Sequence, residues 1–124
     1  MIDLDLIEKL NLLFDRAPFS ITRMISTPMR NRQVGGSAHS WHLDLSCDPA
    51  YARPCGAADL VFDGAEEMHK AVPYAQALGF GGIEMDLTNN HLHLDVRPMD
   101  KKWWVVKTDQ GESPLPPMTP TSQV

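Results

Sequence analysis

The 124-residue sequence has only two cysteines, no long apolar run and no excess of basic side chains. None of its apolar stretches approaches the roughly 18 consecutive residues that a spanning helix needs, so we expect no membrane span. With 11 basic and 16 acidic residues, the net charge of -5 leaves no electrostatic footprint for nucleic acid, which excludes a phosphate-backbone binder. A single cysteine pair is also a poor match to a zinc knuckle, which takes four protein ligands at tighter spacing.

What is present is the composition of one globular domain. Hydrophobic residues make up 43% of the chain and charged residues 22%, which is typical of a folded protein and not of a disordered one. The first residues, Met1–Leu6, are acidic where a secretory signal would be basic. We therefore expect a chain that is made in the cytoplasm.

Apolar periodicity predicts two helices. In residues 4–17 apolar side chains recur at three- and four-residue steps, typical of an amphipathic helix, which Pro18 would end. Residues 65–78 show a similar period, and we expect a second helix there although Pro73 lies within it.

Short β-branched and alternating runs predict a small sheet. Strands are expected over residues 21–26, 57–62, 83–87, 91–96 and 103–106, the last of them at the edge. The third and fourth of these runs flank a polar turn and predict a β-hairpin. We expect a single α+β domain over residues 1–110, with a small, mostly antiparallel sheet flanked by helices. A flexible, Pro-rich tail is expected over residues 111–124.

Histidines are the residues that point to chemistry. Four of the five fall in two clusters, one in an ordered loop and one on the hairpin: His39 and His42, and His91 and His93. Alternation places His91, His93 and Asp95 on one face of their strand. Imidazoles with one carboxylate, for which Asp59 is the natural candidate, suit a catalytic zinc with three protein ligands and an open fourth position. A strand His-x-His pair also occurs as a merely hydrogen-bonded face.

Several short motifs follow one another along the chain: Thr27-Pro28-Met29-Arg30-Asn31, Val34-Gly35-Gly36, Ser40-Trp41-His42-Leu43, Gly56-Ala57-Ala58-Asp59 and His93-Leu94-Asp95. Their order resembles the zinc D-alanyl-D-alanine peptidase family, which shares its fold with the amino-terminal domain of hedgehog proteins. The resemblance covers residues 21–103 and implies a fold of the hedgehog/D-Ala-D-Ala-peptidase type. Dispersed matches in the right order are far more specific than any one of them.

The resemblance implies a Zn²⁺ ion held by His42, Asp59 and His93. Asp95 is then placed to orient a ring nitrogen of a ligand histidine. The segment between His42 and Asp59 is longer than in the family, which leaves His39 as a rival ligand to His42.

The lengthened segment also contains both cysteines. Cys47 and Cys55 could close a loop disulfide that stiffens the chain beside the metal. Two reduced thiols are the alternative, and they are the usual state in a cytosolic protein.

The activity that the resemblance implies is hydrolysis of stem peptides of peptidoglycan at the cell wall, by a carboxypeptidase or by an endopeptidase of the phage endolysin type. In such a site zinc lowers the pKa of its bound water toward about 7 and polarises the scissile carbonyl, while a base takes the proton. The resemblance places His91 beside the water. His91 is the first choice for the base, with Glu84 and Asp86 as alternatives.

The chain departs from the family pattern in its oxyanion group. Ser26 stands where family members commonly have an arginine that stabilises the developing oxyanion. Arg23 and Arg30 are candidates to replace that arginine, and Ser40 is a further candidate for substrate or oxyanion contact.

A second departure concerns the base, because Asn90 stands where several family members have a glutamate. Two other functions therefore stay open. One is a non-catalytic, zinc-stabilised module of the same fold that binds cell walls or belongs to a virion. The other is a small structural domain whose histidines are only hydrogen-bonded.

Overall fold

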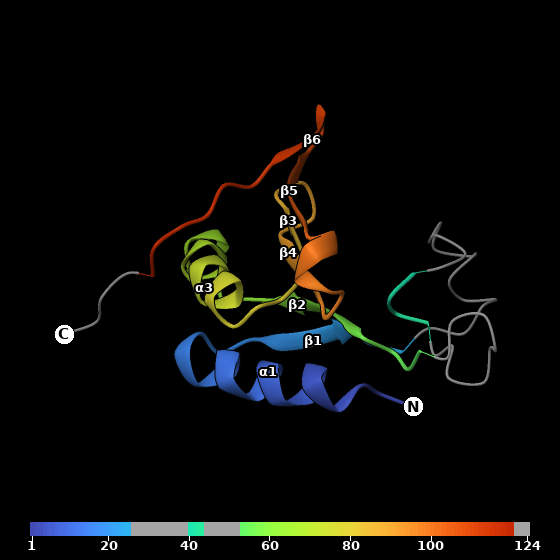
Figure 1. The fold of residues 1–124 in the computed structure, drawn as a ribbon. Coiled ribbons are helices and arrows are strands. Elements are labelled where there is room, and N and C mark those ends of the chain that lie inside the picture. The colour runs from blue at the N-terminus through green and yellow to red at the C-terminus, as the bar shows by residue number, and fades with distance from the viewer. Residues whose placement is uncertain (26–39, 44–52, 121–124) are drawn as a thin grey trace.

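The structure, a computed structural model, describes residues 1–25, 40–43 and 53–120 (Figure 1). Its elements, in chain order, are α1 (Leu4–Arg16), β1 (Ser20–Arg23), β2 (Ala57–Val61), α3 (Ala65–Ala77), β3 (Gly82–Asp86), β4 (His91–Asp95), the 3₁₀ helix η1 (Met99–Lys101), β5 (Trp103–Thr108) and β6 (Gly111–Pro114). Both predicted helices and the predicted hairpin of β3 and β4 are confirmed. Within the described residues, no helix combines the length and the apolar character needed to cross a bilayer.

The strands form one six-stranded sheet in the order β1-β2-β4-β3-β5-β6. The sheet is mixed and not mostly antiparallel as expected, because β3 and β5 run parallel. After the β3–β4 hairpin the chain passes through η1 and returns on the free side of β3, in the direction of β3. An α+β fold in one domain is what the structure shows.

In the C-terminal part, the expected edge position of residues 103–106 is wrong, and the first residues of the expected tail form a strand. β5 is not an edge strand, because β6 pairs with it over residues 111–114. Directly after β6, Leu115 is buried, and the buried Gln76 of α3 binds the backbone that follows it. The amide Nε2 of Gln76 donates to the carbonyl of Pro116 at 2.9 Å, and its Oε1 accepts from the backbone of Met118 at 2.8 Å.

The first helix starts and stops where its sequence provides caps. The carboxylate of Asp3 accepts a hydrogen bond from the backbone N–H of Asp5 at 2.8 Å, which satisfies one of the free donors of the first turn. Asp5 pairs with Lys9 one turn later at 2.9 Å. Pro18 follows the C-cap residue Ala17, and the helix cannot continue through it.

The sheet has an apolar face and a polar face. Leu92 and Leu94 of β4 are fully buried in a core with the apolar faces of α1 and α3. Side chains alternate along a strand, so His91 and His93 project from the opposite face. The helices therefore cover one side of the sheet and leave the histidines on the other.

Replacing Gln76 by alanine tests the packing of the C-terminal segment. The substitution removes two hydrogen bonds and leaves two backbone groups without partners, so we expect a loss of about 1–3 kcal/mol in the free energy of unfolding, measured with urea. The control is Gln110→Ala in the exposed β5–β6 turn, which should change stability little. Equal stability of the two variants would mean that the segment contributes nothing to the fold.

Candidate metal centre

Two of the predicted ligands are brought together by strand pairing. β2 and β4 are antiparallel neighbours, and Asp59 lies directly opposite His93. Directly opposite residues have their side chains on the same face. The carboxylate and the imidazole, 34 positions apart in the chain, thus become neighbours on the polar face.

The third predicted ligand comes from the loop that precedes β2. The hydroxyl of Ser40 accepts the backbone N–H of His42 at 3.2 Å, and the backbone N–H of Gly56 donates to the carbonyl of Trp41 at 2.9 Å. A Cβ on Gly56 would lie 2.9 Å from the Trp41 ring, so glycine leaves room for the indole. These contacts hold His42, which is only 3% exposed, against the sheet.

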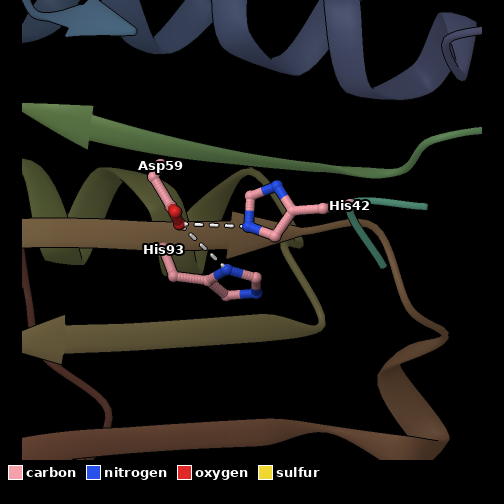
Figure 2. Close-up of side chains that lie close together, drawn as sticks. All are labelled: His42, Asp59 and His93. Carbon is pink, nitrogen blue, oxygen red and sulfur yellow. Dashed lines mark hydrogen bonds and ion pairs between the residues drawn. The ribbon is translucent and has the colours of Figure 1, made fainter. Parts of the chain in front are cut away.

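The three side chains converge on one carboxylate oxygen (Figure 2). Oδ1 of Asp59 is 3.2 Å from Nε2 of His42 and 3.2 Å from Nδ1 of His93. The two imidazole rings meet edge to face, with centroids 5.2 Å apart. Asp59 and His93 keep 14% and 13% of their side chains exposed, so the site is open on one side.

The remaining ring nitrogens are fixed by acceptors. Nδ1 of His42 is 2.9 Å from the backbone carbonyl of Met24, which can only accept, so this nitrogen carries the proton. Nε2 of His93 is 2.8 Å from Oδ2 of Asp95. Nε2 of His42 and Nδ1 of His93 are therefore the nitrogens directed at Asp59, and this is how protein acceptors commonly orient metal-binding histidines.

Asp95 is a fully buried carboxylate with its own partners. It accepts from the backbone N–H and the side-chain Nε of Arg97 at 3.1 and 2.8 Å, and from Nη2 at 2.6 Å. Burial alone would raise its pKa, but hydrogen bonds from His93 and Arg97 outweigh burial and hold the pKa at about 2. A Cβ on Gly82 would lie 2.1 Å from the carboxylate oxygens, so glycine in β3 makes the space for Asp95.

Charge in the site favours a bound cation. Burial would raise the pKa of Asp59, but hydrogen bonds from His42 and His93 and the charges of these rings together lower it well below its usual range. Burial would lower the pKa of His93, but hydrogen bonds to Asp59 and Asp95 raise it from 6.5 to about 9. A carboxylate that stays ionised, beside an imidazole that readily takes up a proton, is an environment that favours a bound cation.

The donor set fits a zinc ion. One nitrogen from His42, one oxygen from Asp59 and one nitrogen from His93 all lie within 4.8 Å of one another. Two imidazoles and one carboxylate, partly open to solvent, match the three-ligand pattern of catalytic zinc. These residues would hold the ion, and Met24 and Asp95 would orient the rings.

The three predicted base candidates form a group of their own beside this one. Donor atoms of Glu84, Asp86 and His91 lie within 4.8 Å of one another. Burial would raise the pKa of Asp86, but hydrogen bonds from Asn89 hold it below its usual range. Burial raises the pKa of Glu84.

Two other predicted site residues, Arg23 and Ser40, lie beside the metal group and are not part of it. Arg23 of β1 is paired with Asp59, next to the metal group, and Ser40 supports the loop of His42. Four further predictions lie outside the described residues: Ser26, Arg30, His39 and Cys47, and with Cys47 the suggested disulfide to Cys55.

Asn90, where several family members have a glutamate, serves the hairpin turn. Its φ of 53° is left-handed, a conformation that asparagine adopts more readily than glutamate.

Two groups that support the site were not predicted from the sequence. The carbonyl of Met24 has no sequence signal, whereas Arg97 could have been found two residues after Asp95, on the same side of the extended chain.

One comparison with known proteins gives a family. The family model described as Peptidase M15 matches residues 2–95, three quarters of the chain. No curated protein and no solved structure matches the chain significantly.

The raised pKa of His93 predicts a pH dependence of the metal-free protein. A group with a higher pKa in the folded state contributes stability that is fully present below its unfolded pKa of 6.5 and is lost as pH rises through about 9. We expect the melting temperature, measured with chelator present, to fall across this interval. Zinc affinity should rise across the same interval, because zinc must displace the proton from Nδ1. In the control His93→Gln the fall should disappear, and a fall of the same size there would assign it to another group.

Asp95→Asn tests the acceptor behind His93. An amide holds the ring less firmly and leaves Arg97 without its carboxylate, so zinc affinity should drop by about 10–100-fold. Competition with a chromophoric chelator measures this affinity. The matched control is Asp100→Asn in the exposed η1 turn, which should bind zinc as the wild type does. Unchanged affinity in Asp95→Asn would show that Asp95 does not act on the metal site.

Proposed function

Because the chain belongs to the peptidase M15 family, we propose that it is a zinc peptidase acting on the stem peptides of peptidoglycan. The observation that carries the proposal is the convergence of His42 Nε2 and His93 Nδ1 on Asp59 Oδ1 in a partly open site. Family membership supports a metallopeptidase, and the same geometry suits that chemistry.

Each ligand residue has a distinct task. Zinc, when bound, supplies a Lewis acid that lowers the pKa of a coordinated water and polarises the scissile carbonyl. Asp59 compensates part of the charge of the ion, and His42 and His93 fix its position. The buried Asp95 keeps the proton of His93 on Nε2, away from the ion.

We assign the proton acceptor to His91. It lies two residues before His93 on the same face of β4, and its Nε2 faces Oδ2 of Asp86 at 3.7 Å. Nε2 is thereby directed at a carboxylate, and Nδ1 is the nitrogen left to accept a proton from the attacking water. Glu84, directly opposite His93, is the alternative base, whereas Asp86 is already committed to three hydrogen bonds in the turn.

Aromatic side chains stacked with guanidinium groups lie beside the metal group. The ring of Trp103 stands edge-on to His93, with centroids 6.0 Å apart, and the Arg97 guanidinium lies 4.9 Å from the centroid of Trp103. A second guanidinium, of Arg53, stacks on Trp41 at 3.9 Å. Because Arg97 is already paired with Asp95, the aromatic surfaces are what would contact the end of a short peptide, and on them we favour the carboxypeptidase type over the endopeptidase type, acting at the cell wall.

The proposal is tested with a purified muropeptide that ends in D-Ala-D-Ala. We expect zinc-dependent release of D-alanine, which chromatography and mass spectrometry would measure. His93→Ala should lose both zinc and turnover. His91→Asn should keep zinc, and its kcat should fall by about 10²–10⁴-fold if His91 is the base.

The control for both variants is His69→Ala, because His69 is exposed on α3, which packs on the apolar face of the sheet, opposite the site. Full turnover in His91→Asn with loss in Glu84→Gln would transfer the base role to Glu84. A wild-type protein that binds zinc and cleaves no muropeptide would contradict the peptidase proposal in favour of a non-catalytic module.

A further inference from the structure

A second group of ligand-type side chains lies beside the first on the polar face of the sheet. In the β3–β4 hairpin, Asp86 is directly opposite His91 and Glu84 is directly opposite His93. One donor atom each from Glu84, Asp86 and His91 falls within a 4.8 Å cluster. The two groups share β4, whose His91 serves one and whose His93 serves the other.

Asp86 is held rigidly in this group. It is 1% exposed, and its Oδ1 accepts the backbone N–H groups of Thr88 and Asn89 at 2.9 and 3.0 Å. Its Oδ2 accepts from the side chain of Asn89 at 3.1 Å and lies 3.7 Å from Nε2 of His91. That separation is too long for a hydrogen bond. One lone pair of Asp86 and one nitrogen of His91 thus face each other without satisfying each other.

Glu84 adds a second carboxylate, which, unlike Asp86, has no close partner among the described residues. Its side chain is half-buried, and it makes no hydrogen bond or ion pair within the part of the chain that the structure describes. Lys107 of β5, which is paired with Asp86, acts electrostatically on both carboxylates, and so do the neighbouring histidines: His93 on Glu84 and His91 on Asp86. Glu84 and His91 are part-exposed and their donor atoms converge on the buried Asp86, so a cation from solvent can reach all three.

We propose that Glu84, Asp86 and His91 bind a second divalent transition-metal ion. One imidazole and two carboxylates suit zinc and its neighbours in the first transition series. Same-face positions on a strand are about 6.6 Å apart, whereas metals that act as a pair lie about 3.5–4 Å apart. The second ion therefore binds separately from the first and is not a partner in the same step.

The second ion has a consequence that rests on the function proposed above. Its ligands are His91 and Glu84, the first-choice and alternative bases. A cation bound at Nε2 of His91 leaves the ring proton on Nδ1, and a cation bound to Glu84 occupies its carboxylate, so neither group can accept a proton. Excess zinc should therefore inhibit an enzyme that requires zinc at its first site.

The test is a calorimetric titration of the metal-free full chain with Zn²⁺ alone, in a buffer that does not bind metal. We expect two equivalents per chain, one tight and one weaker. Glu84→Gln and His91→Asn should each weaken the second equivalent at least tenfold and keep the tight one, whereas His42→Ala should remove the tight one. The matched controls Glu67→Gln and His69→Asn, on the exposed side of α3, should keep both equivalents.

Lys107→Met is a variant that should strengthen metal binding at the second site instead of weakening it. Removing this cation should tighten the second equivalent several-fold, which a merely destabilised protein would not do. One equivalent in the wild type up to millimolar zinc would overturn the second site, as would a second equivalent that survives in both Glu84→Gln and His91→Asn. Because the titration needs no turnover, two equivalents in a protein without peptidase activity would support the second site and contradict the proposed function alone.

Discussion

The register between β2 and β4 is the constraint on which the candidate metal centre depends. Asp59 faces His93 only because Leu60 faces Leu92 and Ala58 faces Leu94. These apolar partners are buried between the sheet and the helices. A slip by one residue would carry His93 into the core and a leucine to the surface. Hydrophobic burial on one face of the sheet thus sets the position of the polar groups on the other.

Charged groups follow one another from this strand pair into the interior of the protein. Asp59 and Asp95 flank His93 on its two ring nitrogens, and Arg97 then compensates Asp95 in the interior. Burying a carboxylate is costly unless its lone pairs are filled, and here three groups of Arg97 and one of His93 fill them. Gly82, which has no side chain, leaves the space that the Asp95 carboxylate occupies. The metal centre is consequently supported by a second layer that is as specific as the ligands themselves.

Local patterns predicted much of the fold, and motif order predicted the residues that converge. Helical periodicity found α1 and α3, and alternation found the hairpin, since these signals depend on near neighbours in the chain. The mixed sheet was missed because the parallel partner of β3 is chosen by a connection through η1, which leaves no periodic signal. β6 was missed because prolines suggested a loose tail, whereas Pro114 lies at the end of an edge strand, where its missing N–H costs little. The carbonyl of Met24 could not be read from residue types at all.

The wide spacing of the ligands along the chain also determines when the centre can exist. The β3–β4 hairpin is local and can form early, but Asp59 and His42 reach it only when distant segments dock. No partly folded chain therefore possesses the complete triad of donors. Metal binding by this set of donors, and with it the proposed hydrolysis, therefore requires the finished tertiary structure.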